Sequence, residues 1–263
     1  MTSVKQPSKF SLMAWQIWLP LVLIVTWFLV SANSTSPFWP PLTSIFAAMG
    51  EWAASGALWQ DFLFSFGNYI VGVGIAVVLG LGFGVAIGLM PRLARVLDPF
   101  LDFLRSLPNV VFVPIIVLVL GIDAWPKIAL IAFACMWPVL LNCIEGVRQI
   151  APSVFEATLA YRIPLWLKIR KVVLPGSLPQ IVVGVRLAIT VGLVMLVVSE
   201  MYGSTSGMGF FILDNSQRFR LADAWAGTIL IGVIGWLITY VYAKFEHRML
   251  AWHRQEDIKE RAS

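Results

Sequence analysis

Two ionisable residues that lie within long apolar segments are the first candidates for chemistry. Glu200 stands at the end of an apolar run, and Arg186 lies near the start of the same run. Ionisable groups at membrane depth are costly and often functional, so both are candidates to line a polar path, together with Asn142 and Ser199. Structural alternatives stay open: Glu200 could meet water or accept backbone N–H groups of the turn at 203–209, and Arg186 could extend its charge to the surface.

The sequence lacks the motifs of common hydrolases. It contains no Gly-Lys-Ser/Thr phosphate loop, no His-Glu-x-x-His pair and no nucleophile elbow. Cys135 and Cys143 lie in an apolar run without metal-ligand spacing to His247 or His253, so we interpret them as small core residues. No catalytic, cofactor or metal site is expected in this chain. Energy for uphill movement of a solute would then come from a partner or an ion gradient.

The composition indicates an integral membrane protein. Of 263 residues, 59% are hydrophobic and only 13% are charged, whereas a soluble domain is charged at roughly a quarter of its positions. The net charge of +5 could suggest a nucleic-acid partner. In a membrane chain the placement of the charges matters more than their sum, so no nucleic acid is expected.

Six apolar segments are long enough, or nearly so, to cross a bilayer as helices. The fold class expected is an all-α, polytopic membrane protein. A cleaved signal peptide is the alternative for the first segment, and an earlier start, in a helix carrying Arg105, stays open for the third. The predicted spans are 15–30, 65–90, 110–121, 128–143, 181–198 and 224–243.

Basic residues are unevenly divided between the two sides of these spans. With six spans, the two termini, the 2–3 loop and the 4–5 loop share one side, and Lys and Arg concentrate there. Cytosolic loops carry the excess of Lys and Arg, so both termini are predicted in the cytosol. The opposite side has only Lys127, Arg218 and Arg220, and the segment 31–56 is expected along its interface. The cytosolic set is Lys5, Lys9, Arg92, Arg95, Arg148, Arg162, Lys168, Arg170, Lys171, Lys244, Arg248, Arg254, Lys259 and Arg261.

Small residues mark a predicted helix-packing face in the second span. Gly80, Gly84 and Gly88 recur at intervals of four, so they share one face of a helix. Small residues allow two helix backbones to approach closely, either as static packing or as a crossing that pivots during transport. Three prolines in the region that follows are expected to kink or break helices: Pro108, Pro114 and Pro138. Broken helices are typical where a solute path is lined, but they are also common in plain helix bundles. 

The segment from Glu145 to Pro179 is too polar for the membrane. It predicts two short helices on the cytosolic face, one through Glu156 and a second from Trp166 toward Leu174-Pro175, separated by Pro164. Two such helices form a rigid projection that can fit a groove on a partner. Alternatively, the basic residues Lys168, Arg170 and Lys171 could bind lipid headgroups.

This segment resembles the Glu-Ala-Ala loop of ABC importer permeases, the binding-protein-dependent transport inner-membrane components. Glu156-Ala157-Thr158 matches the motif, and Pro175 follows at the family's spacing. Further matches are Leu174-Pro175-Gly176-Ser177-Leu178-Pro179, Gly184-Val185-Arg186, Leu97-Asp98-Pro99, Arg105-Ser106-Leu107-Pro108, Pro114 with Gly121-Ile122, and Glu200 with Gly207-Met208-Gly209. The resemblance covers about residues 57 to 245 and is closest to the branch that serves nitrate, taurine and alkanesulfonates.

One position departs from the family pattern. Arg162 stands where the family has a glycine, and Thr158 replaces the second alanine. Glycine at that position permits a left-handed turn residue, a conformation that costs other residues about 1 kcal/mol. Either the turn differs, with Pro164 setting it, or Arg162 makes a charge contact to a partner.

The resemblance implies a type I ABC importer permease architecture and a set of partners. The expected parts are an N-terminal region (1–64), a permease core (65–245) with a coupling loop (145–180), and a C-terminal tail (246–263). A second copy, usually identical, would complete the path, and two cytosolic ATPase subunits would bind ATP and Mg. A solute-binding protein would deliver cargo outside a bacterial inner membrane. The residues implied in ATPase coupling are Glu156, Ala157, Thr158, Tyr161, Arg162, Leu174 and Pro175.

Two other functions compete with an ATP-driven importer. A secondary transporter or channel that acts alone is disfavoured, because the spans lack paired acidic residues for proton or sodium coupling. A membrane-bound enzyme is disfavoured because no catalytic constellation can be assembled. The solute is not identified by the sequence; the branch implies a small organic or inorganic anion such as a sulfonate, taurine or nitrate.

Overall fold

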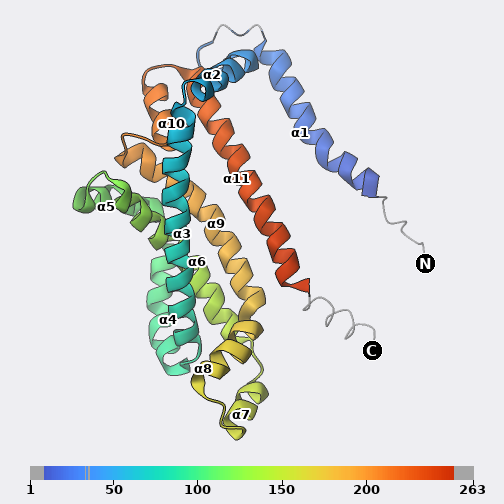
Figure 1. Cartoon of the computed structure of the whole chain (residues 1–263), viewed down its shortest axis with the longest axis vertical. Helices are drawn as coiled ribbons and strands as arrows, with labels where there is room; N and C mark the ends of the chain where they lie inside the picture. Colours follow the sequence, from blue (N-terminus) through green and yellow to red (C-terminus); the bar gives the residue numbers. More distant parts are fainter. Residues whose placement is uncertain (1–8, 33, 35, 252–263) are drawn as a thin grey trace.

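Four long apolar helices form the body of the protein in the computed structural model (Figure 1). They are α3 (Ala57–Gly88), α6 (Ala124–Arg148), α9 (Leu174–Gly203) and α11 (Leu221–Met249). Each is long and apolar enough to cross a membrane, since about 20 residues suffice. The structure describes residues 9–32, 34 and 36–251, and within these ranges it contains helices and connecting turns but no strand.

Shorter elements lie at the two ends of this bundle and along its sides (Figure 1). At one end of Figure 1 lie α2 and α10, and at the other lie α7 and α8; we call these the α2 end and the α7 end. The shorter elements are α1 (Lys9–Ser31), α2 (Leu42–Ala54), α4 (Pro91–Ser106), η1 (Asn109–Val111), α5 (Phe112–Leu120), α7 (Pro152–Ala160), α8 (Leu165–Lys168), η2 (Ile169–Val173) and α10 (Met208–Gln217).

Helices α3 and α6 pack closely against each other, and glycine makes the contact possible. A Cβ atom added to Gly84 would lie 2.6 Å from the Cβ of Cys143, and one on Gly80 would lie 2.8 Å from the Cβ of Val139. Gly88 meets Val147 in the same way, one turn further along each helix. No described atom lies within 4 Å of a Cβ at Gly82, on the other face of α3. The glycines spaced four residues apart therefore form the seam along which α3 and α6 touch.

The main hydrophobic core lies where α6 is held between α3 and α9. Ala76, Ile131, Val139 and Ala188 are each fully buried in it. Cys135 is also buried there, and its thiol lies 3.1 Å from the carbonyl oxygen of Ala188. Both cysteines are free and buried, so they serve as small core side chains.

The third predicted span is a bent pair of helices rather than one straight segment. The helices Pro91–Ser106 and Asn109–Leu120 meet at 75° across Leu107 and Pro108. Leu107 is extended, with ψ 128°, because a residue that precedes proline avoids the helical region. The predicted start at 110 misses the first arm of this pair, whereas the alternative of an earlier start in a helix carrying Arg105 is confirmed by α4. By contrast α6 continues through Pro138, and Pro114 lies in the first turn of α5, so neither breaks its helix.

The sequence predicts a separate short second helix in the 4–5 loop, but in the structure this helix is continuous with α9. Residues Leu165–Gly203 form one continuous helical run, in which η2 has the wider π-helical turn and leads directly into α9. Pro175 lies at the first positions of α9, just after the π turn. A π-helical turn changes the local bonding register, which lets the chain pass a proline that lacks an N–H group.

At the α2 end, three tryptophans join α1 to the bundle. The ring centroids of Trp27 in α1 and Trp225 in α11 lie 5.0 Å apart, and the Trp39 ring lies 5.1 Å from that of Trp27 at an angle of 30°. From this point α1 slants away from α11 (Figure 1). The predicted domain boundaries at 64/65 and 245/246 both fall inside helices, α3 and α11 respectively.

Candidate functional site

The residues predicted to contact an ATPase divide into an exposed group and a packed group. Glu156, Ala157, Tyr161 and Arg162 are exposed on α7 and its final turn. Thr158 is buried and its hydroxyl donates to the carbonyl oxygen of Phe155 at 2.7 Å. Leu174 and Pro175 lie half-buried at the start of α9, at the other end of the same loop.

Large apolar side chains surround this exposed group, a feature that the motif did not indicate. Leu159 is 72% exposed and Tyr161 81%, and Leu165 and Trp166 on α8 are similarly open. We call these four residues the α7–α8 surface. Exposed apolar side chains outside the long apolar helices mark an interaction site, and aromatic residues are frequent anchors of interfaces. The signal in the sequence is the presence of Tyr161 and Trp166 within a segment that is too polar for the membrane.

The turn after α7 has the geometry that the family's glycine predicts, although arginine occupies it. Arg162 has φ +50°. Its N–H donates to the Leu159 carbonyl oxygen at 3.0 Å, and the Ile163 N–H donates to that of Thr158 at 2.9 Å. This pair of bonds is a Schellman motif, and Pro164 follows it at once. The alternative of a differently shaped turn is therefore wrong.

A second contact braces α7 against α8. The Lys168 ammonium lies 4.7 Å from the centroid of the Phe155 ring, a cation–π distance. The buried Thr158 and the Schellman turn fix the same corner from inside. The α7–α8 surface is thus held on a rigid support, as a docking surface requires.

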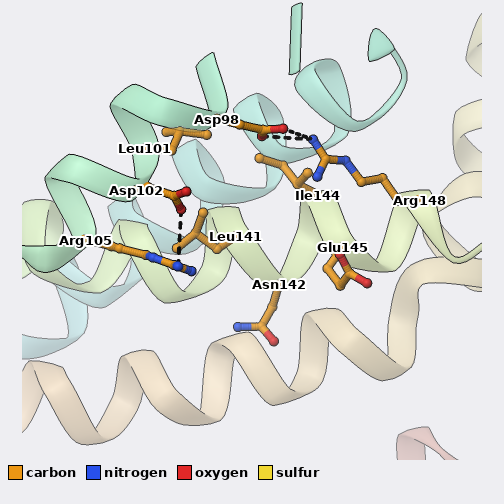
Figure 2. A pocket seen from close by; sticks show the side chains of 9 residues that line it. All are labelled: Asp98, Leu101, Asp102, Arg105, Leu141, Asn142, Ile144, Glu145 and Arg148. Carbon is orange, nitrogen blue, oxygen red and sulfur yellow. Dashed lines mark hydrogen bonds and ion pairs between the residues drawn. The ribbon is translucent and has the colours of Figure 1, made fainter. Parts of the chain in front are cut away.

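A polar cavity of about 430 Å³ opens between α4 and α6 (Figure 2). Two ion pairs cross or line it. Arg148 of α6 binds both carboxylate oxygens of Asp98 in α4, at 3.0 and 3.2 Å, and Arg105 meets Asp102 at 3.3 Å. Its complete lining is Asp98, Leu101, Asp102, Arg105, Leu141, Asn142, Ile144, Glu145 and Arg148.

A second cavity of about 330 Å³ adjoins the first and reaches α9. Both cavities are lined by Arg105, Leu141 and Asn142, so they form one groove along α4, α6 and α9. The first is the outer cavity of this groove, nearer the α7 end, and the second is the inner cavity. The lining of the inner cavity is Arg105, Asn109, Ala134, Trp137, Pro138, Leu141, Asn142, Leu187 and Val191.

The structure separates the four residues predicted for a solute path. Asn142 lines both cavities. Arg186 instead faces α11, where its guanidinium lies 3.6 Å from the Glu246 carboxylate. Ser199 is buried and donates to the carbonyl oxygen of Leu196 at 2.9 Å. Glu200 lies at the far end of α9. The sequence reasoning missed the groove residues of α4, although Asp98, Asp102 and Arg105 recur at helical spacing there.

Glu200 holds the start of α10, which was the structural alternative for this residue. Its side chain is fully buried, and one carboxylate oxygen accepts the Gly209 N–H at 2.9 Å. The neighbouring N–H groups are also held by side chains: that of Gly207 donates to Asp61 at 2.8 Å, and that of Met208 donates to Ser65 at 2.9 Å. Helix N-termini leave their first N–H groups unpaired, so these three side chains from α3 and α9 cap α10.

Lys127 is the other buried ionisable residue at this end. It is 1% exposed, and its ammonium donates to the carbonyl oxygens of Ile122 and Asp123 at 2.7 Å each. These bonds give hydrogen-bond partners to two carbonyl groups of the turn before α6. Among the described residues, no group of three or more His, Cys, Asp or Glu side chains could hold a metal ion.

Comparison with known proteins identifies the family. Residues 76–250 match the model of the binding-protein-dependent transport system inner membrane component. The chain is 31% identical to the putative aliphatic sulfonates transport permease protein SsuC of Bacillus subtilis (strain 168), over 89% of this chain and 86% of that protein. It is 29% identical to the taurine transport system permease protein TauC of Escherichia coli (strain K12), over 89% and 88%. It is 32% identical to the bicarbonate transport system permease protein CmpB of Synechococcus elongatus, over 75% and 68%.

Solved structures have the same helical arrangement. Two inward-facing forms of the MetNI methionine ABC transporter superpose with TM-scores of 0.62 and 0.64, at 17% and 15% identity. They cover 73% and 75% of this chain, and 96% and 98% of the matched chain. The long apolar helices make this a multi-pass membrane protein. The chain belongs to the family of binding-protein-dependent transport system inner membrane components.

Proposed function

We propose that this protein is the permease subunit of an ATP-driven importer for a small oxyanion. Its relatives are named for aliphatic sulfonates, taurine, bicarbonate and nitrate. Each of these solutes has a small group of oxygen atoms that bears a full or partial negative charge. The permease would supply the path, and energy would come from ATP and Mg bound by two partner ATPase subunits.

The observation that carries the proposal is the rigid, exposed α7–α8 surface at one end of the bundle. An apolar surface of this kind, rimmed by Glu156 and Arg162, suits a groove on a soluble partner. It stands beyond the long apolar helices, where a soluble subunit can reach it (Figure 1). An ATPase bound there would pull on α7 and α8 when it closes on ATP.

We also propose an orientation for the protein in the membrane. Among the described residues Lys and Arg concentrate at the α7 end, so this end would lie in the cytosol of a bacterial inner membrane, on the same side as both termini. A solute-binding protein would then meet the α2 end. A second copy of the chain would cover the groove of α4, α6 and α9, so that the path runs between the two copies.

The test is a tagged purification from detergent-solubilised native membranes, followed by mass spectrometry. We expect a stoichiometric P-loop ATPase with the wild-type protein and its loss with Glu156→Arg, because charge reversal disrupts the docking surface. Glu51→Arg, an equivalent change at an exposed position of α2, should retain the ATPase. A protein that is purified alone, although correctly inserted, would instead support a stand-alone transporter.

A further inference from the structure

We propose that the inner cavity of the groove is a binding subsite for the oxyanion group of the transported solute, with Arg105, Asn109 and Asn142 as its polar residues. This inference rests on the proposed function. It assigns a solute contact to the permease itself, on residues other than those the sequence suggested. Three features of the groove support it: the division of charge between the two cavities, the weak pairing of Arg105, and the chemistry of the remaining lining.

Charge is divided sharply between the two cavities. The outer cavity has three carboxylates, Asp98, Asp102 and Glu145, beside its two arginines. Among the described residues that line the inner cavity none is a carboxylate, and Arg105 is its one charged group. An anion that enters the groove therefore meets a net positive site only in the inner cavity.

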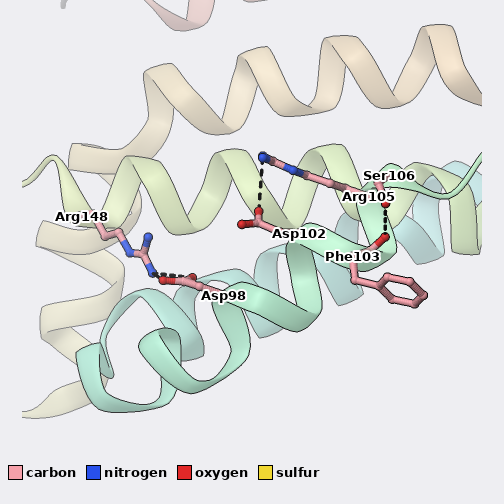
Figure 3. A network of polar contacts seen from close by, with 6 residues as sticks. All are labelled: Asp98, Asp102, Phe103, Arg105, Ser106 and Arg148. Carbon is pink, nitrogen blue, oxygen red and sulfur yellow. Dashed lines mark hydrogen bonds and ion pairs between the residues drawn. The ribbon is translucent and has the colours of Figure 1, made fainter.

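The two arginines of the groove differ in how firmly they are held (Figure 3). Arg148 forms hydrogen bonds to both carboxylate oxygens of Asp98, a geometry that fixes a guanidinium. Arg105 makes one 3.3 Å contact to Asp102, and the two side chains are 59% and 63% exposed. Exposed pairs of this kind contribute little to stability. Because a guanidinium has five N–H groups, Arg105 can turn to a bound oxyanion at small cost.

The backbone brings further donors beside Arg105. Asn109 follows the 75° bend after α4 and lines the inner cavity from η1. The Asn142 amide donates one N–H to the Pro138 carbonyl oxygen at 2.8 Å, which leaves its second N–H for another acceptor. Two neutral amide side chains beside one guanidinium form an arrangement that suits an oxyanion.

Apolar side chains complete the cavity opposite these donors. Leu187 and Val191 of α9 form one wall, and Ala134 and Pro138 of α6 form another. A sulfonate with a short carbon chain could place its charged group at Arg105 and its carbon atoms against α9. Binding sites for small molecules commonly combine an apolar lining with a few polar groups that fix orientation.

The test measures solute moved per ATP hydrolysed in proteoliposomes that contain the complete complex with its ATPase and solute-binding protein. The probes are labelled taurine, methanesulfonate, nitrate and bicarbonate. For any of these that the wild-type complex transports, Arg105→Gln should lower the ratio about tenfold, the size of effect expected for a lost charged hydrogen bond. Asp102→Asn should maintain or raise the ratio, because it releases Arg105. Arg95→Gln, an exposed position of α4 outside the groove, is the matched control and should leave the ratio unchanged.

Two results would overturn the subsite. In the first, Arg105→Gln retains the wild-type ratio. In the second, Arg105→Gln and Asp102→Asn lower it equally, which means that the ion pair acts only as a structural contact. Neither result affects the proposed function, since the wild-type complex still transports an anion. That function fails separately if the wild-type complex moves none of the four anions with ATP.

Discussion

Arg162 occupies a left-handed conformation that glycine adopts at no steric cost. Its φ of +50° completes the Schellman turn after α7, and the exposed side chain extends beside the α7–α8 surface. The backbone cost of such a residue is about 1 kcal/mol. A protein that retains arginine here accepts that cost, which favours a role for the guanidinium at the docking surface.

At this position, Arg162→Gly should stabilise the isolated permease by about 0.5–1 kcal/mol, because it relieves the left-handed strain. Thermal unfolding of the purified protein in detergent measures the change. Arg162→Ala also removes the charge but retains a Cβ atom, so it should give no such gain. Equal unfolding temperatures for the two variants would show that the turn is unstrained.

Single residues differed in how well the sequence predicted them. For Arg162 the sequence left open a differently shaped turn or a charge contact to a partner, and the observed φ of +50° excludes the first of these. For Glu200 the sequence left a path residue and a backbone contact open, and the observed bond to Gly209 is the second of these. Arg186 pairs with Glu246 across sixty positions of sequence, a contact that no local pattern could indicate.

At the scale of helices, the seam between α3 and α6 depends on what lies opposite each glycine. Gly84 faces the backbone and Cβ of α6 at distances that leave no room for a side chain, whereas Gly82 faces open space. The two positions are only two residues apart in the same helix, so helix propensity affects them alike.

Gly84→Val should therefore destabilise the protein by about 1–3 kcal/mol, the usual cost of overpacking a close contact. Gly82→Val is the matched control and should change stability little. The unfolding temperature in detergent, with the amount of protein inserted in membranes, checks both. If the two variants behave alike, the glycine seam does not determine how closely the helices pack.

Helix positions were predictable, and helix connections were not. Apolar runs of about 20 residues identify α3, α6, α9 and α11 because lipid requires them. Pro108 predicted a break in a helix, which the structure confirms, but its angle of 75° and the π turn at η2 are features that periodicity does not report. The groove between α4, α6 and α9 follows from that bend, so the sequence could not place it.

At the scale of the whole molecule, orientation in the membrane is testable with cysteine labels. Cys135 and Cys143 are buried, so introduced cysteines should react without background. We expect Phe219→Cys, 72% exposed at the α2 end, to react with a membrane-impermeant maleimide on intact spheroplasts. Arg92→Cys, exposed at the start of α4, should react only after permeabilisation. The reverse pattern would place the α7 end outside, away from any cytosolic ATPase.

The unbroken helical run Leu165–Gly203 joins the two ends of the molecule mechanically. It contains 39 residues, starts with Leu165 and Trp166 at the α7–α8 surface, and ends beside the carboxylate that caps α10. Within this run α9 has 30 residues, about 45 Å at 1.5 Å per residue, and a tilt of about 5° around its midpoint displaces each end by about 2 Å. That displacement approaches the length of a hydrogen bond. A small movement of α8 would thus be transmitted through the helix backbone to the hydrogen bonds that hold α10, without a relay of side chains.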